Sequence, residues 1–118
     1  MRVAELANNW GLENLVVSDR EIPTPGAGEV LVRLTAASLN FRDWLMLTGQ
    51  YNPRQPLPLV PGSDGAGVVE ACGSSVSRFS AGDRVTATFF RDWTCGEPAP
   101  GALRTSLGGP LDGTLTQY

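Results

Sequence analysis

Glycine and proline interrupt this chain so often that short strands joined by tight turns are the structure it favours. Fourteen glycines and nine prolines are spread over 118 residues. Glycine supplies the backbone conformations that turns require, and proline lacks the N–H group that the interior of a helix or sheet needs. The pattern therefore predicts a mainly β fold rather than a helical bundle.

The segments between these interruptions have the length and composition of strands. Residues 29–38 form the clearest one, because the segment is rich in β-branched side chains and partly alternates. Residues 65–72 indicate a second central strand, whose glycines permit close backbone approach or a bulge. Shorter strands are expected as an N-terminal hairpin and farther along the chain, at residues 2–7, 15–18, 84–89 and 111–118.

Composition limits the classes of function. The length fits one domain, residues 1–118, with a core of its own. Nine basic residues against twelve acidic ones make neither nucleic acid nor an anionic membrane an expected partner. Histidine, the commonest general base, is absent. Two isolated cysteines, Cys72 and Cys95, and the lack of any signal-like or membrane-spanning apolar stretch predict a cytoplasmic protein.

Most side chains with useful chemistry lie between residues 38 and 73. This stretch passes from the end of an apolar strand through a short amphipathic helix at residues 41–47, and a proline-rich loop follows. Such a layout presents polar side chains on loops that a rigid sheet holds in place. The polar residues of the stretch are Asn40, Arg42, Asp43, Tyr51, Ser63 and Asp64.

Five short motifs in a fixed order connect the chain with a known family. They are PGAGEVLVR at residues 25–33, SLNFRD at 38–43, LPLVPGSDGAGVV at 57–69, GDRV at 82–85 and GGPLDG at 108–113. In these motifs the chain resembles the N-terminal, GroES-like catalytic domain of the medium-chain dehydrogenase/reductase superfamily, which contains zinc alcohol dehydrogenases and zinc-free quinone oxidoreductases. The resemblance implies a partly open β-barrel with short helices.

The resemblance also implies that NAD(P) binds mainly to a Rossmann domain that this chain lacks, so the chain alone is not expected to hold the cofactor. Gly65 and Gly67 do not supply a dinucleotide fingerprint. Glu70 stands where the third glycine is needed, and no helix pattern follows. Packing of a strand is the preferred interpretation of these two glycines.

The zinc ligands of the family are replaced in this sequence. Zinc-binding relatives carry a cysteine at the start of the short helix and a histidine in a Gly-His-Glu triplet, where this chain has Asn40 and the triplet at residues 62–64. Neither an amide nor an unionised hydroxyl is a usual ligand of catalytic zinc. The structural zinc site needs four cysteines, and the matching loop has only Cys95. We expect no zinc, and we interpret Asp64 as a turn acceptor and Cys72 as a small core residue.

The resemblance suggests roles for Asn40 and Tyr51, and the chemistry of its side chain suggests one for Arg42. Asn40 is expected to donate its amide to a substrate carbonyl or a cofactor ribose, while capping of the helix is the alternative and both can hold together. Tyr51 lies at the spacing from Asn40 at which enoyl-thioester reductases of this superfamily carry a proton-donating tyrosine; the alternative is a loop tyrosine that covers the barrel. Arg42 is a candidate ligand of a cofactor phosphate, although solvation or pairing with Asp43 is preferred. Leu45 replaces a tyrosine of many quinone oxidoreductases, which weakens a specific quinone assignment.

Two functions remain open. The first is the catalytic-domain portion of an NAD(P)-dependent oxidoreductase, inactive alone, that reduces a small-molecule carbonyl, quinone or activated double bond. The second is a stand-alone binding or assembly module that forms a homodimer or meets a protein partner through apolar surface. Four aromatic side chains suit a substrate cleft, a core or such a surface equally well: Trp44, Phe89, Phe90 and Trp93.

Overall fold

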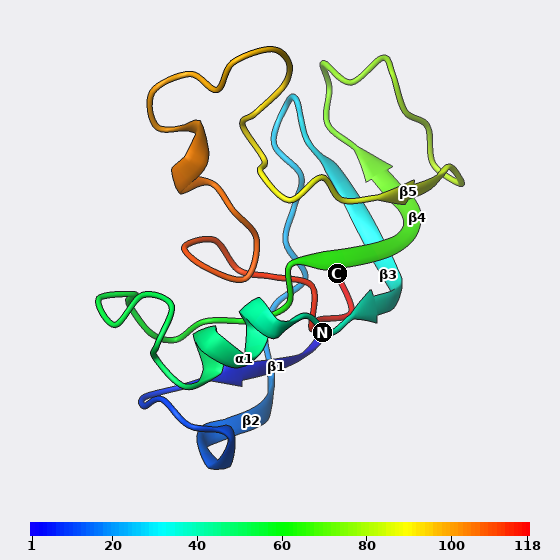
Figure 1. Cartoon of the computed structure of the whole chain (residues 1–118). Coiled ribbons are helices and arrows are strands. Elements are labelled where there is room, and N and C mark those ends of the chain that lie inside the picture. Colours follow the sequence, from blue (N-terminus) through cyan, green and yellow to red (C-terminus); the bar gives the residue numbers. More distant parts are fainter.

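The protein, described here by a computed structural model of residues 1–118, is mainly β and contains two antiparallel sheets (Figure 1). One sheet pairs β1 with β2, and the other has the order β3-β4-β5. No helix is long and apolar enough to cross a membrane. In chain order the elements are β1 (Arg2–Leu6), η1 (Leu12–Asn14), β2 (Leu15–Asp19), β3 (Val30–Ser38), α1 (Phe41–Leu47), β4 (Asp64–Cys72), β5 (Arg84–Thr86) and η2 (Ala102–Arg104). The predicted mainly β fold class with short helices is confirmed, and the strands form two separate sheets that do not close into a barrel.

The long strands β3 and β4 form the centre of the larger sheet, and both occur within one residue of the predicted bounds. Two register slips bend β3 as it crosses β4. A Cβ atom on Gly67 would lie 2.2 Å from the carbonyl oxygen of Arg33. This glycine therefore allows the two backbones to approach closely, which confirms the interpretation of residues 65–67 as strand packing.

The third predicted strand is shorter than expected. β5 ends at Thr86 rather than at Phe89. The N–H of Ala87 still donates to the carbonyl of Gly65 at 3.0 Å, but the regular pairing of the two strands ends with Thr86 and Ala66. The chain then leaves the sheet and pairs with a later segment. The N–H of Leu107 donates to the carbonyl of Phe89 at 3.0 Å, and Phe90 forms an isolated bridge with Ser106.

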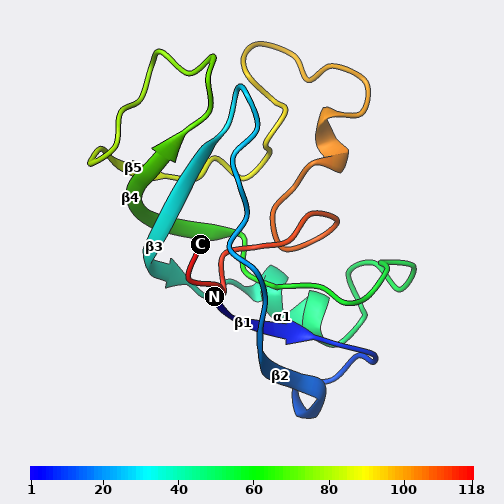
Figure 2. The same ribbon diagram turned by 180° about the vertical axis from the view of Figure 1, so that it is seen from behind.

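The C-terminal residues 111–118 do not form the predicted regular strand. They thread between the two sheets, where the N–H of Ala4 donates to the carbonyl of Leu115 at 2.8 Å. On the other side, the N–H of Leu34 donates to the carbonyl of Gln117 at 2.9 Å. Both chain termini consequently lie close together, as Figures 1 and 2 show from opposite sides. This segment connects β1 with β3 and ties the two sheets into one body.

The buried core lies where β1, α1 and the loop before β4 meet. Leu6 and Leu59 exchange two backbone hydrogen bonds of 2.9 and 3.0 Å, which fixes this loop against β1. Helix α1 lies beside them and buries its last turn. The buried apolar residues are Val3, Leu6, Met46, Leu47, Leu59, Val60, Val69 and Ala102.

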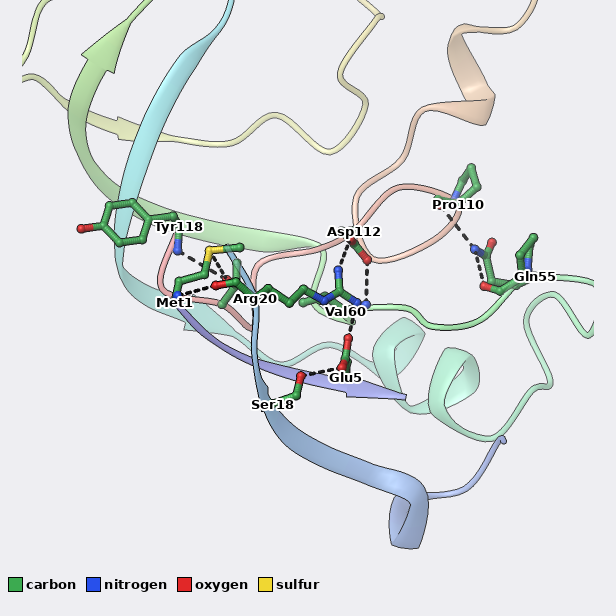
Figure 3. A network of polar contacts seen from close by, with 11 residues as sticks. Met1, Glu5, Ser18, Arg20, Gln55, Val60, Pro110, Asp112 and Tyr118 are labelled. Atoms are coloured by element: carbon green, nitrogen blue, oxygen red, sulfur yellow. Dashed lines mark hydrogen bonds and ion pairs between the residues drawn. The ribbon is translucent and has the colours of Figure 1, made fainter. Parts of the chain in front are cut away.

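A charged network fastens the β1–β2 hairpin to the C-terminal segment (Figure 3). Arg20 donates to the carboxylate of Glu5 and, at 2.8 Å, to Asp112. Ser18 donates its hydroxyl to Glu5, and the N–H of Val60 donates to Asp112 at 2.9 Å. The hydrogen bond from Ser18, followed by the bond and charge of Arg20, lowers the pKa of Glu5 despite the opposing effect of burial.

The direction of this shift predicts how stability depends on pH. A carboxylate whose pKa is lowered by folding stabilises the protein above its unfolded-state pKa and loses that contribution as the pH falls through the folded value. We expect Glu5→Gln to lower the free energy of unfolding by about 1–2 kcal/mol near neutral pH, with the gap to the wild type closing below about pH 4. Urea unfolding at several pH values measures the gap. A gap of constant size would show that the charge of Glu5 does not contribute.

Candidate functional site

Asn40 lies at the junction of β3 and α1, where the backbone changes direction. The N–H of Asn40 donates to Oδ2 of Asp43 at 2.8 Å, while the N–H of Asp43 donates to the carbonyl of Asn40 at 2.9 Å. This reciprocal arrangement fixes the first turn of α1, and Asn40 occupies the predicted N-cap position. The cap holds the Asn40 side chain at the exposed end of the strand.

The Asn40 side chain belongs to a cluster of four polar residues. Its amide nitrogen Nδ2 donates to Oδ2 of Asp64 at 2.7 Å and lies 3.5 Å from Oγ of Ser63. The hydroxyl of Ser63 donates in turn to Oδ1 of Asp43 at 3.4 Å. Asp43 and Ser63 are each 2% exposed, whereas Asn40 and Asp64 reach solvent. Asp64 is thus an acceptor for Asn40, and its interpretation as a turn acceptor is wrong.

The donor atoms of this cluster do not fit a catalytic zinc ion. The cluster offers one amide, one hydroxyl and two carboxylates, without sulfur or imidazole, and no group of three or more His, Cys, Asp or Glu residues in the protein is placed to hold a metal. Catalytic zinc is held in a tetrahedral site by three protein ligands, drawn from cysteine sulfur, histidine nitrogen and carboxylate oxygen, and its fourth position stays open. The two cysteines, Cys72 and Cys95, are free and exposed. The interpretation of Cys72 as a core residue is therefore wrong.

Arg42 is bound to the chain itself and does not pair with Asp43, which corrects the preferred prediction. Its guanidinium donates to the carbonyls of Leu107 and Gly109 at 3.0 and 2.6 Å, with a longer contact of 3.4 Å to Gly108. A further bond of 3.3 Å reaches Oγ of Ser106. Arg42 thus pins residues 106–109 against α1, and its terminal nitrogens are already engaged with this loop.

The same guanidinium lies between two aromatic rings. The central carbon of Arg42 is 4.6 Å from the ring centroid of Tyr51 and 4.9 Å from that of Phe89. Both rings line a groove of about 590 Å³ that also has Phe90, Leu103 and Ser106 in its walls. Tyr51 is about half exposed, so its phenol is accessible from this groove.

The predicted site residues form two neighbourhoods rather than one. Asn40 contacts Ser63 and Asp64, whereas Tyr51 contacts Arg42 and the groove. Helix α1 connects them, because Asn40 precedes its first turn and Arg42 lies within that turn. Sequence reasoning missed the groove-lining residues of the 103–110 segment. The run of two glycines and a proline at residues 108–110 was the signal for a tight loop at this place.

The aromatic side chains that could not be assigned from sequence divide into two groups. Phe89 and Phe90 are half-buried beside the groove and stack edge to face with centroids 4.5 Å apart. Trp44 and Trp93 are exposed at the surface. Trp44 shares the exposed start of α1 with the apolar residues Leu39 and Phe41, of which the side chains are largely solvent-exposed.

Comparison with known proteins gives a consistent result. Residues 26–118 match the family model of the alcohol dehydrogenase GroES-like domain. The chain is 43% identical over 109 residues to a zinc-type alcohol dehydrogenase-like protein of Schizosaccharomyces pombe, covering 92% of this chain and 32% of that protein. It is 38% identical over 89 residues to the quinone oxidoreductase of Lama guanicoe, covering 75% of this chain and 27% of that protein.

Solved structures are similar over almost the whole chain. The crystal structure of an NAD-dependent alcohol dehydrogenase superposes with a TM-score of 0.82 at 35% identity, covering 99% of this chain and 36% of the other. A thermostable alcohol dehydrogenase from Pyrobaculum aerophilum gives a TM-score of 0.81 at 34% identity, with coverage of 99% and 37%. The chain thus spans about a third of the length of the proteins that it matches.

Proposed function

The chain belongs to the alcohol dehydrogenase GroES-like domain family, and from this membership we propose that it is the catalytic-domain portion of an NAD(P)-dependent, zinc-independent oxidoreductase. The proposed reaction is reduction of a carbonyl, a quinone or an activated double bond in a small molecule. Relatives of both the alcohol dehydrogenase and the quinone oxidoreductase type support this class of reaction. The same family membership favours a GroES-like domain over residues 1–118 and nucleotide binding by a separate domain.

One observation carries the proposal that no zinc takes part. At the two positions where zinc-binding relatives have cysteine and histidine, this chain has Asn40 and Ser63, and their side chains are held by hydrogen bonds to Asp64 and Asp43. An amide and a hydroxyl engaged in this way are poor metal ligands. We therefore assign no step of the reaction to a metal.

Asn40 is the proposed hydrogen-bond donor at the reacting carbonyl or at a cofactor ribose. NAD(P)H, when bound, supplies the hydride. The exposed amide of Asn40 is held by Asp64 at 2.7 Å, which limits its rotation and keeps its N–H groups at the surface between β3 and α1. A donor fixed before the substrate arrives stabilises developing negative charge with little reorganisation.

Tyr51 is the proposed proton donor. Its ring is held against the guanidinium of Arg42, while its edge remains exposed to the groove. A phenol can protonate a developing enolate when it lies within hydrogen-bond reach. Arg42 is more suited to holding Tyr51 and the 106–109 loop than to a cofactor phosphate, because four acceptors of the chain already engage it.

The function is tested by comparing this chain with the longer protein of which we propose it is a portion. With NADPH and a naphthoquinone or an enone, we expect the longer protein to reduce the substrate. Dialysis against a zinc chelator should leave the rate unchanged, and elemental analysis should find far less than one zinc per chain. The 118-residue chain alone should be at least about a hundredfold slower, because nothing positions the hydride donor.

Two outcomes would contradict the proposal. Loss of activity on chelation, restored by zinc, would overturn zinc independence while leaving the oxidoreductase class in place. If the longer protein reduces neither substrate, and this chain self-associates through the apolar residues at the start of α1, the alternative of a binding or assembly module is favoured. The exposed side chains of Leu39, Phe41 and Trp44 are the observation that keeps this alternative open.

A further inference from the structure

The groove beside Tyr51 has aromatic and aliphatic side chains in its walls, together with a few polar residues. Three segments contribute to it: residues 51–52, residues 89–90 and residues 103–110. Its volume of about 590 Å³ is sufficient for a ligand with one or two fused rings. Tyr51, Phe89 and Phe90 supply aromatic faces and edges, against which a planar ligand can stack with its ring centroid at about 4.5–7 Å.

The charge around this groove is positive, although the chain as a whole has a formal net charge of −3. No acidic residue lines the groove, and Arg104 is its one charged lining residue. Arg104 is exposed and takes part in none of the four ion pairs of the protein. On the neighbouring loop, Asp92 is paired with Arg91 at 2.9 Å and does not neutralise Arg104.

A second positive charge lies behind the aromatic wall. Arg42 contacts the rings of Tyr51 and Phe89 and also makes no ion pair. The partners of its terminal nitrogens are carbonyl and hydroxyl oxygens, which do not cancel its net charge, and its Nε is buried without a hydrogen-bond partner. The groove therefore has aromatic walls and two arginines that lack a carboxylate partner.

We propose that the substrate of this site is a planar aromatic or conjugated compound that carries an acidic group, and that Arg104 binds this group. The inference rests on the proposed function, because it names the class of molecule that the reductase accepts. The guanidinium offers a planar fork that matches a carboxylate or a sulfonate. Ser106 is not available for this task, since its hydroxyl donates to the carbonyl of Gly109 at 2.6 Å and accepts from Arg42. Arg104 is thus the specificity-determining residue for the acidic substituent.

Two probes of the same shape test the proposal with the 118-residue chain. They are 2-naphthoate, which has a carboxylate, and 2-naphthamide, which is neutral. Titrations followed by amide chemical shifts should place both rings at the groove, with 2-naphthoate binding about threefold to tenfold more tightly at low salt. Added salt should reduce this preference, because the interaction with Arg104 is exposed to solvent.

Variants that lose one positive charge at different positions show whether the preference for 2-naphthoate comes from Arg104 or from the net charge of the whole protein. Arg104→Gln should bring the ratio of the two affinities close to one while leaving the binding of 2-naphthamide unchanged. Arg104→Lys should keep part of the preference. The control Arg78→Gln removes one positive charge at an exposed residue that does not line this groove, and it should retain the full preference.

The outcomes separate this inference from the proposed function. Equal binding of the two probes by the wild type, or an unchanged ratio in Arg104→Gln, would overturn the assignment of an acidic substrate and leave the reductase proposal in place. Probe shifts located away from the groove would overturn it as well. Failure of the longer protein to reduce any quinone or enone would instead remove the proposed function, whatever the naphthoate titration gives.

Discussion

Replacing Gly113 by alanine will destabilise the protein by about 2–4 kcal/mol, one of the two largest effects that we expect. A Cβ atom on Gly113 would lie 2.1 Å from the carbonyl oxygen of Gly62 and 2.6 Å from that of Pro61. Both are backbone atoms and cannot move aside as the end of a side chain can. The N–H of Gly113 also donates to the carbonyl of Val60 at 2.7 Å, so the C-terminal segment cannot shift without losing this bond.

The measurement is urea unfolding of the wild type and the variant, with Gly28→Ala as the control. An added Cβ on Gly28 has no atom within 4 Å, and its φ is outside the positive range that excludes side chains. We expect the control to remain within about 0.5 kcal/mol of the wild type. Equal stability of the two variants would show that the approach of residues 61–62 to the C-terminal segment is looser than the structure indicates.

Features that depend on neighbouring residues were predictable from the sequence. The β-branched run of β3 and the glycine-containing pattern of β4 located the two central strands. Asn40 followed by Asp43 located the start of α1, because an acceptor at the N-cap and an acid three residues later satisfy free N–H groups of the first turn. The bounds 41–47 of this helix are confirmed.

Features that depend on distant partners were not predictable in this way. β5 ends at Thr86 because the chain then leaves β4 and residues 89–90 pair with residues 106–107, although the pattern of apolar residues continues beyond Thr86. Residues 111–118 have the composition of a strand, but they lie between β1 and β3 and hydrogen-bond to both. The position of the C-terminal segment depends on close approaches of the backbone at glycines such as Gly62 and Gly113. A single sequence does not show which segments approach each other.

In the candidate site, too, the residues named by short motifs were predictable and their distant partners were not. The family motifs led to Asn40, Ser63 and Tyr51, but they did not reveal that Asp64 holds the amide of Asn40. The hydrogen-bond partners of Arg42 were also not predictable, because most of them are backbone carbonyls, which every residue possesses. Only the folded chain brings residues 106–109 to the guanidinium and creates the groove beside Tyr51.

The second large effect concerns Arg42 itself. We expect Arg42→Met to lower the free energy of unfolding by about 2–4 kcal/mol, because it removes hydrogen bonds to Ser106, Leu107 and Gly109. The carbonyl of Leu107 would lose its partner, and the carbonyl of Gly109 would keep only the hydroxyl of Ser106. Methionine retains much of the aliphatic stem, so the loss reports on the guanidinium rather than on volume. Arg42→Lys should recover part of the stability, since an ammonium lacks the planar fork that reaches several acceptors at once.

The control for this variant is Arg54→Met, at an exposed arginine in the loop after α1 that makes no ion pair, and we expect a change of less than about 0.5 kcal/mol. Urea unfolding measures both, and amide chemical shifts of residues 106–109 show whether the loop has moved.

The comparison also decides between the two roles considered for Arg42. A residue that serves only to bind a cofactor phosphate would leave the stability of the 118-residue chain unchanged on substitution. A residue that positions the groove must lower stability and shift the resonances of Tyr51 and Phe89 in the absence of any cofactor.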